Sequence, residues 1–255
     1  MQGVTLKCLG SSSSGNGYIL ETENEALMIE CGISMREVKK ALNFNLRKVL
    51  ACIVSHRHSD HSKHLPEVIK CGIKVLALTD VLKNHKDPVS QSFTKAIEPM
   101  HGYKVGNFKI YAFDLNHADN DCTPCPCIGF IIEHPEMGKL MFITDTMMMK
   151  YRFSGVNHVM IEANYHDALL DYNIERGITE AWQKPRLLAS HLEIKQTQRI
   201  LQGLDLSIVY DVVLLHLSSR NSDPPIFKKT IEGVTGIPTY IASPGLVLQL
   251  CKDIY

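Results

Sequence analysis

Four side chains of the kinds that bind metal ions lie within six consecutive residues of this chain. His56, His58, Asp60 and His61 form an H-x-H-x-D-H pattern directly after the apolar run 49–54. Imidazole nitrogen and carboxylate oxygen are the usual ligands of zinc and similar divalent ions, and ligands two residues apart converge only where the backbone turns sharply. A histidine-rich polar surface loop is the alternative, but this spacing favours a metal site.

Further candidate ligands lie at the ends of three other apolar runs: His117, Asp145 and His216. Taken alone, each is an ordinary polar residue at the end of a strand. Strand ends in a parallel or mixed sheet gather side chains into one crevice. Together with the histidine cluster, these three residues therefore indicate a site that can hold two metal ions.

The composition limits the classes of function. Lys+Arg and Asp+Glu both number 27, so the formal net charge is zero, and any binding of nucleic acid must come from a local patch. Eight cysteines are scattered among apolar segments and no signal-peptide pattern precedes them, so we expect reduced thiols and a cytoplasmic location. No apolar run approaches the roughly 18 residues of a membrane span, so we expect no membrane partner.

Strand-like runs alternate with helical patterns along the whole chain. Strands are expected at 4–9, 17–22, 25–30, 49–55, 73–78, 92–99, 104–115, 127–134, 138–145, 210–217, 238–242 and 246–251. Helices are expected at 34–45, 65–72, 167–184, 194–204 and 225–234. This order favours two sheets back to back with helices outside. No repeat or linker interrupts it, so we expect residues 1–255 to form one domain.

With these residues in place, the chain resembles the metallo-β-lactamase-fold hydrolase superfamily over essentially its whole length. The resemblance implies an α/β fold, a four-layer αββα sandwich, with two divalent metal ions, Zn or Mn, at the edge of the sheets. It implies one ion on His56, His58 and His117, a second on Asp60, His61 and His216, and Asp145 as the bridge between them.

Two later stretches resemble elements of tRNase Z-like phosphodiesterases. "VMIEANYHDALL" places Glu162 in the matching position, although Asn164 and Tyr165 replace the usual pair, and "LLASHLEIKQT" supplies His191. The alternative to a catalytic role is that His191 is a structural residue at the start of a helix. The resemblance implies that His191, oriented and kept protonated by Glu162, acts as the general acid or as a phosphate clamp.

The opening "LGSSSSGNGYIL" and the later "HLSSRNSD" are similar to segments of the small YycJ-like single-domain exonucleases of the same superfamily. By composition alone, the first stretch would be a flexible hairpin loop. As part of the resemblance it becomes a loop at the mouth of the site, with donors to substrate phosphate or base. The implied substrate-binding residues are Ser13, Asn16, Ser218 and Arg220.

The implied function is that of a metal-dependent phosphodiesterase, a 5′–3′ exonuclease on single-stranded DNA, with RNA left open. Two ions would share a hydroxide with a pKa lowered towards about 7 and would neutralise phosphate oxygens during in-line attack. The implied catalytic residues are Asp60, Asp145, Glu162 and His191. No inserted helical domain or tRNA-binding arm is evident between these motifs, which disfavours tRNA processing.

Other functions stay open from the sequence. The alternative enzyme hydrolyses a small ester, thioester or lactone, as glyoxalase II does, because the same ligands serve that reaction. A metal-stabilised binding module is the non-enzymatic alternative. The run Cys122, Cys125 and Cys127 is interpreted as reduced thiols beside the site rather than a soft-metal site, because a fourth soft ligand is missing nearby. Metal identity and oligomeric state do not follow from the sequence.

Overall fold

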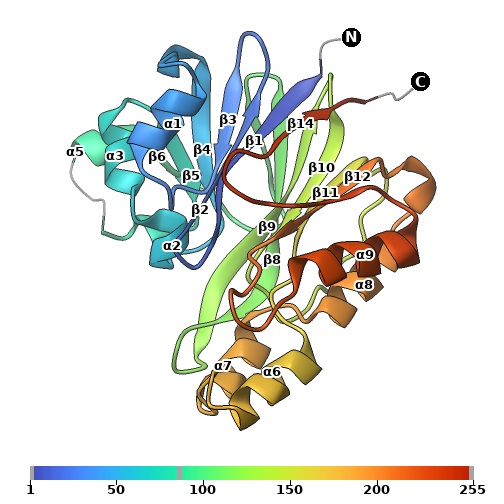
Figure 1. Cartoon of the computed structure of the whole chain (residues 1–255). Coiled ribbons are helices and arrows are strands. Elements are labelled where there is room, and N and C mark those ends of the chain that lie inside the picture. The colour runs from blue at the N-terminus through green and yellow to red at the C-terminus, as the bar shows by residue number, and fades with distance from the viewer. Residues whose placement is uncertain (1–2, 85–87, 253–255) are drawn as a thin grey trace.

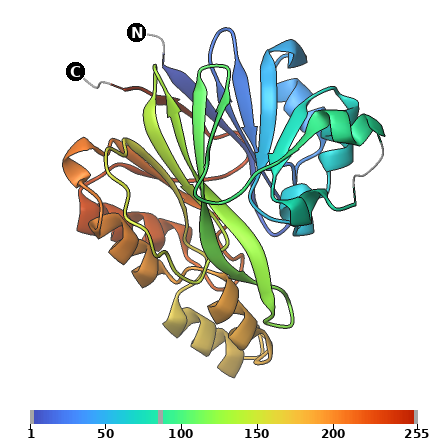
Figure 2. The same cartoon turned by 180° about the vertical axis from the view of Figure 1, so that it is seen from behind.

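Two sheets of seven strands each form the centre of the molecule, and helices cover their outer faces (Figure 1). This arrangement is seen in a computed structural model that describes residues 3–84 and 88–252. The longest strands, β8 and β9, pair as one hairpin that is visible from both sides of the molecule (Figure 2). The predicted four-layer α/β sandwich is confirmed.

The first sheet has the strand order β14-β1-β2-β3-β4-β5-β6. Its strands are β1 (Val4–Ser12), β2 (Gly15–Glu21), β3 (Ala26–Ile29), β4 (Val49–Val54), β5 (Lys74–Ala77), β6 (Thr94–Ala96) and β14 (Val247–Leu250). Pairing is antiparallel from β14 to β3 and parallel from β3 to β6. The sheet therefore joins strands from both ends of the chain.

The second sheet has the strand order β13-β12-β11-β10-β9-β8-β7. Its strands are β7 (Gly102–Val105), β8 (Phe108–Ala118), β9 (Pro124–His134), β10 (Gly138–Ile143), β11 (His158–Glu162), β12 (Asp211–Leu215) and β13 (Thr239–Ile241). Strands β7 to β10 pair antiparallel, and β10 to β13 pair parallel. The carboxyl ends of β10, β11 and β12 consequently meet at one edge of the sheet.

The helices divide between the two sheets (Figure 1). On the side of the first sheet are α1 (Met35–Ala41), α2 (Ser59–Ser62), α3 (Leu65–Lys70), α4 (Thr79–Leu82) and α5 (Pro88–Phe93). On the side of the second sheet are α6 (Asp167–Glu175), α7 (Gln183–Ser190), α8 (Ile194–Gln202) and α9 (Pro224–Thr235). Short 3-10 turns cover Leu46–Lys48 and Leu206–Ile208. Among the described residues, no helix has the length and apolar character needed to cross a membrane.

Alternate side chains of β8 pack into two different hydrophobic clusters. Ile110 and Ala112 belong to the buried cluster that contains residues of both sheets. Phe113 and Leu115 belong to the cluster on the outer face, which includes Phe227 of α9. Because successive side chains of a strand point to opposite faces, both layers are filled from one segment.

Three sequence-based boundaries were wrong, each for a local reason. The strand expected at 92–99 is only β6, because α5 continues to Phe93. The run 104–115 is a hairpin of β7 and β8, with Gly106 in the turn at φ 57°. The helix expected at 167–184 is two helices, α6 and α7, and Gly177 at φ 68° lies between them. Glycine adopts this left-handed backbone without steric cost, so it ends regular structure at these points.

The Glu25 carboxylate links the two sheets. It lies between β2 and β3, and it accepts hydrogen bonds from the Asn107 backbone N–H (3.0 Å) and from His134 Nε2 (3.1 Å) of the second sheet. Burial raises the pKa of this carboxyl group, but the donors outweigh burial and hold the pKa below its ordinary value. The stabilisation is therefore present above the unfolded-state pKa of about 4.3 and is lost as the pH falls.

We expect Glu25→Gln to lower the free energy of unfolding by about 1.5–3 kcal/mol at pH 7, the range for hydrogen bonds to a charged group. The loss should shrink as the pH is lowered from 7 to about 3, because a carboxylate with a lowered pKa becomes protonated only below the ordinary value of about 4.3. Urea unfolding at the two pH values measures this, with the exposed Glu175→Gln as the matched control. Equal losses at both pH values would show that the charge of Glu25 is not what stabilises the fold.

Candidate metal centre

The seven predicted ligands come from five segments that end at the same edge of the sandwich. His56 and His58 lie in the loop after β4, and Asp60 and His61 lie in α2, which follows at once. The other three ligands lie at the carboxyl ends of strands of the second sheet: His117 in β8, Asp145 after β10 and His216 after β12. The structure therefore brings together residues that are up to 160 positions apart in the chain (216 minus 56).

The backbone turns abruptly where three strands reach this edge. Glu30 after β3, Asp145 after β10 and His216 after β12 have φ values of 65°, 29° and 51°. Non-glycine residues rarely adopt positive φ, and such residues concentrate where structure around a site holds them. Each of these three side chains is also buried.

His56, His58, His117 and Asp145 form the first group of converging ligand atoms, all within 4.8 Å of one another. His117 Nε2 lies 3.0 Å from His58 Nδ1, and His56 Nε2 lies 3.7 Å from Asp145 Oδ2. The buried His56 Nε2 has no hydrogen-bond partner among the described residues. A buried polar nitrogen without a partner costs free energy, and a metal ion at this position would satisfy it.

Asp60, His61, His216 and Asp145 form the second group, again with ligand atoms within 4.8 Å of one another. His216 Nε2 lies 3.1 Å from Asp60 Oδ2, and His61 Nε2 lies 3.4 Å from Asp145 Oδ2. Asp145 belongs to both groups, so its carboxylate can contact two ions. The donor set of imidazoles and carboxylates fits zinc and similar divalent ions.

Burial and charge prepare these side chains for cations. Burial, together with the neighbouring His61, holds the pKa of His56 well below its ordinary value. Burial likewise lowers the pKa of His117 to about 4. Burial raises the pKa of Asp145, but His216 and His61 outweigh burial and hold it well below the ordinary value. For these three residues, the neutral imidazoles and the ionised carboxylate are the protonation states that metal binding requires. Burial lowers the pKa of His61 and of His216, but Asp145 outweighs burial and holds both above the ordinary imidazole value. These two ligands would therefore release a proton when a metal ion binds.

The outer nitrogens of the first-group imidazoles are held by partners around the site. Ser55 Oγ lies 2.9 Å from His56 Nδ1, the Ser190 carbonyl accepts from His117 Nδ1 at 3.1 Å, and Asp119 Oδ1 lies 2.8 Å from His58 Nε2. Partners of this kind fix the tautomer and the orientation of a ligating imidazole. The inner nitrogens are therefore directed toward one another.

Sequence reasoning missed several residues that support the ligands. Asp119 is itself held by Arg57, which also pairs with Asp80 at 2.9 Å. Glu30 accepts from the Ser55 backbone N–H at 3.3 Å and lies 3.4 Å from His61 Nδ1. Only their positions could have indicated this role, because Asp119 lies two residues after His117 and Glu30 lies at the end of a predicted strand.

Glu162 and His191 meet as predicted beside the metal centre. Glu162 Oε1 accepts from His191 Nδ1 at 2.6 Å, and its second oxygen accepts from the Leu192 backbone N–H at 3.0 Å. The His191 ring stacks on the His216 ring, with centroids 5.4 Å apart and planes 12° apart. Because Nδ1 is bonded to Glu162, Nε2 is the nitrogen of His191 that is available to a substrate. Asp145, Glu162, His191 and His216 also have ligand atoms within 4.8 Å of one another.

The structure gives the four predicted substrate-binding residues different surroundings. Ser13 is exposed in the turn between β1 and β2. Asn16 is buried, and its amide lies 3.2 Å from Asp60 Oδ2 and 3.0 Å from His61 Nε2, so that it contacts two of the candidate ligands. Ser218 accepts from the Asn221 backbone N–H at 3.1 Å, and Arg220 donates to the Ile178 carbonyl at 2.9 Å.

The cysteine run lies on β9 and the turn before it. Cys122 is exposed, whereas Cys125 and Cys127 are buried, and all three are free. Burial raises the pKa of Cys125 to about 12, so its thiol is poorly ionised at neutral pH. His58, Asp119 and Cys125 have ligand atoms within 4.8 Å of one another, but Arg57 donates to both Asp119 and Cys125. This cation opposes a metal ion there.

A four-layer sandwich with a histidine–aspartate cluster at the edge of its sheets defines a metal-dependent hydrolase of the metallo-β-lactamase fold. Residues 26–217 match the family described as the beta-lactamase superfamily domain, and the chain belongs to this family. The family and the converging ligands together imply divalent metal ions at this centre.

Individual relatives agree with this assignment. Exodeoxyribonuclease WalJ of Streptococcus pneumoniae is 25% identical over 244 residues, which cover 86% of this chain and 84% of WalJ. Exodeoxyribonuclease YycJ of Bacillus anthracis is 26% identical over 189 residues, 66% of each chain. The metallo-beta-lactamase fold protein YhfI of Bacillus subtilis has a TM-score of 0.71 at 16% identity, covering 96% of this chain and 99% of YhfI.

Gly32 allows the ligand loop to approach β2. A Cβ atom at Gly32 would lie 1.7 Å from the Asp60 carbonyl oxygen and 2.7 Å from the Asn16 backbone nitrogen. Both are backbone atoms, so the loop that carries Asp60 and His61 would have to move. We expect Gly32→Ala to weaken metal binding by at least about 10-fold and to lower the free energy of unfolding by about 1–3 kcal/mol.

Calorimetric metal titration and urea unfolding measure the two effects of Gly32→Ala. Gly233→Ala is the control, because Gly233 lies in α9 and, apart from its chain neighbours and the backbone of its own helix, no atom of the described residues lies within 4 Å of the position of the added methyl group. That control should stabilise the protein by about 0.5–1 kcal/mol. Unchanged metal affinity in Gly32→Ala would contradict the role given to this close approach.

Proposed function

We propose that this chain is a binuclear metal-dependent phosphodiesterase that degrades nucleic acid, acting as a 5′–3′ exonuclease on single-stranded DNA. Its ions, Zn or Mn, would be held by His56, His58, His117, Asp60, His61, His216 and the shared Asp145. The proposal extends to a single domain over residues 1–255 and to a cytoplasmic location, which the free cysteines support.

The Glu162–His191 pair is the observation that carries the proposal. Hydrolysis of an ester or thioester uses the same metal ligands and does not require such a pair. A nucleotide 3′ oxygen is a poor leaving group and needs a proton as it departs. The buried Glu162 carboxylate holds the His191 ring through Nδ1, which leaves Nε2 free to donate a proton to the leaving oxygen.

The remaining chemistry follows from the charges at the centre. Two divalent ions, when bound, supply Lewis-acid stabilisation of phosphate oxygens and lower the pKa of water. Asp145 orients both halves of the centre through its two oxygens, which lie 3.4 Å from His61 Nε2 and 3.9 Å from His216 Nδ1. Asn16 keeps Asp60 and His61 in place. The similarity to WalJ and YycJ, both named exodeoxyribonucleases, supports DNA as the substrate.

End-labelled single-stranded DNA and RNA, assayed with Zn and with Mn, test the proposal directly. We expect release of nucleotides from the 5′ end of the DNA, and metal analysis should find up to two ions per chain. A 5′-label and a 3′-label distinguish the direction of cleavage. Hydrolysis of a thioester or lactone with no cleavage of either nucleic acid would replace the proposal with the acyl-hydrolase alternative.

A further inference from the structure

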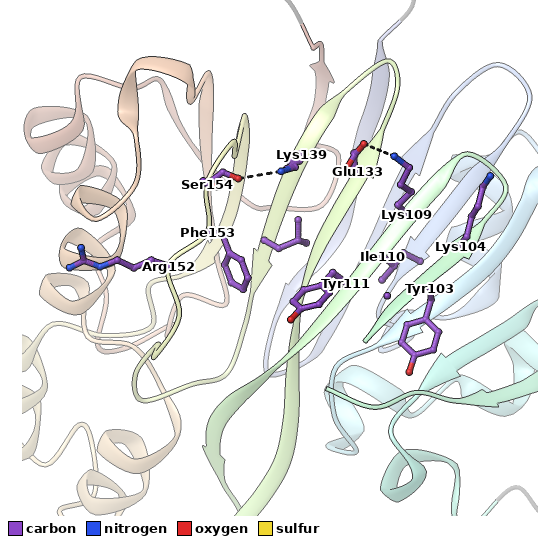
Figure 3. A pocket seen from close by; sticks show the side chains of 12 residues that line it. Tyr103, Lys104, Lys109, Ile110, Tyr111, Glu133, Lys139, Arg152, Phe153 and Ser154 are labelled. Carbon is purple, nitrogen blue, oxygen red and sulfur yellow. Dashed lines mark hydrogen bonds and ion pairs between the residues drawn. The ribbon is translucent and has the colours of Figure 1, made fainter. Parts of the chain in front are cut away.

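A hollow of about 690 Å³ lies on the outer face of the second sheet, away from the metal ligands. Strands β7 to β10 and the segment 152–154 line it. Tyr111 and Phe153 contribute to its apolar part (Figure 3). Ile131 also lines it. Tyr111 shares a face of β8 with Phe113 because alternate residues of a strand point the same way. The hollow therefore lies on the outer face of the sheet, next to the outer hydrophobic cluster that contains Phe113.

Positive charge is concentrated around this hollow. Lys104, Lys109, Lys139 and Arg152 line it, together with one acidic residue, Glu133 (Figure 3). Lys109 pairs with Glu133 at 2.9 Å. Within residues 3–84 and 88–252, Lys104 and Arg152 form no ion pair. Since the whole chain has a net charge of zero, this excess is a local feature that complements a polyanion.

Aromatic side chains in the hollow are held in fixed positions. The Tyr111 and Phe153 rings contact edge to face, with centroids 6.3 Å apart, and Phe153 also packs on Phe113 at 4.6 Å. Tyr103 lies opposite Ile110 on the neighbouring strand and packs toward the inner core, so its ring is not part of this aromatic surface. Tyr111 and Phe153 are both partly exposed. Fixed aromatic rings beside cations are the features on which single-stranded nucleic acids stack and bind.

A second basic hollow adjoins the first at Arg152. It has a volume of about 370 Å³, shares Arg152 with the first hollow, and is also lined by Met148, Lys150 and Arg199. Its walls are the segment 148–152 and α8. The segment 148–152 begins three residues after Asp145, and α8 begins three residues after His191. Both segments therefore lead away from residues of the metal centre.

We propose that the two hollows form one docking path for single-stranded DNA that enters the metal centre, a proposal that rests on the nuclease function above. Tyr111 and His117 are six residues apart on β8, which corresponds to about 20 Å. At the 3.4 Å spacing of a stacked strand, that length covers about six nucleotides. Oligonucleotides shorter than this leave the path partly empty.

The double variant Lys104→Glu/Arg152→Glu tests the path. We expect its KM for a strand of about 20 nucleotides to rise about 10-fold, while the kcat for that strand changes little. The slope of log KM against log salt should fall by about 1.4, since each phosphate contact to a single strand contributes about 0.7. Hydrolysis of bis(p-nitrophenyl) phosphate, which occupies only the metal centre, should be unchanged.

The charge-matched control is Lys70→Glu/Lys74→Glu, two exposed lysines on the side of the first sheet. It should behave as wild type on both substrates. Equal KM values for the wild type and the Lys104/Arg152 variant would overturn the path while leaving the nuclease proposal intact. A change in oligomeric state of the Lys104/Arg152 variant, measured by light scattering, would also overturn it, because the face would then be an interface between copies.

Binding is measured separately from cleavage with a fluorescent phosphorothioate oligonucleotide. Anisotropy should show about 10-fold weaker binding for the Lys104/Arg152 variant than for wild type or control. If the variant binds about 10-fold more weakly but the wild type does not cleave unmodified DNA, the result would support the path and overturn the nuclease proposal. No binding by the wild type would overturn the path.

Discussion

Asp60→Ala is expected to lower turnover on DNA by several orders of magnitude and to leave the fold largely intact. Asp60 Oδ2 lies 3.1 Å from His216 Nε2 and 3.3 Å from His61 Nε2, within the second group of ligands. If two ions are bound as proposed, its loss would remove a negative charge and a ligand from one of them, and both ions are needed to stabilise an in-line displacement. The Asp60 side chain is partly exposed and outside the apolar core, so its removal leaves no core cavity.

Steady-state hydrolysis, metal content and circular dichroism distinguish the outcomes for Asp60→Ala. The expected result is about one ion less per chain, native secondary structure and very low turnover. Asp121→Ala, an exposed aspartate in the nearby turn before β9, is the control and should retain activity. Full activity of Asp60→Ala would refute the two-metal mechanism, and loss of the fold would instead give the metal a structural role.

His191→Ala is expected to slow cleavage of DNA by about 10²- to 10⁴-fold, the range that general acid catalysis supplies. His191 is bonded to Glu162 through Nδ1 at 2.6 Å and is stacked on His216. Its free nitrogen can protonate a leaving oxygen. Bis(p-nitrophenyl) phosphate, whose leaving group needs little protonation, should be affected much less. The comparison of the two substrates therefore isolates proton transfer.

Single-turnover rates on both substrates measure the effect of His191→Ala. The exposed His101→Ala is the control for loss of an imidazole elsewhere. Equal losses on both substrates would assign His191 to phosphate binding rather than to proton transfer. An unaffected rate on DNA, with intact thioester hydrolysis, would remove the phosphodiesterase proposal altogether.

The candidate metal ligands could be predicted from the sequence because each occupies a recognisable position in it. His117, Asp145 and His216 each end an apolar strand, and the fold places those strand ends at one edge. The pair of Glu162 and His191 was found through motif resemblance, and the structure brings them within 2.6 Å. Apolar alternation and the position of a strand end can be recognised in the sequence because strand geometry is regular.

The supporting residues were not accessible, because ordinary side chains acquire their role only from tertiary contacts. Asp119 and Glu30 carry no spacing pattern, yet each contacts a candidate ligand. Asn16 was expected at the site as a substrate contact, and its contact with His61 could not be predicted from the sequence. Asn164, seen in the sequence only as a departure from a motif, donates to the His216 carbonyl at 2.7 Å. The hollows that carry the proposed DNA path combine strands, loops and a helix, so no local pattern predicts them.

The pairing of β1 with β14 has a consequence for synthesis on the ribosome. Val4 lies opposite Leu250, so the first sheet joins strands 246 positions apart (250 minus 4). At about 5–20 residues per second, β1 waits on the order of 10–50 s for its partner. Throughout that interval one edge of the nascent sheet has unpaired backbone groups, which can pair with other chains. Chaperone binding to the nascent N-terminal half would cover this edge during the vulnerable period.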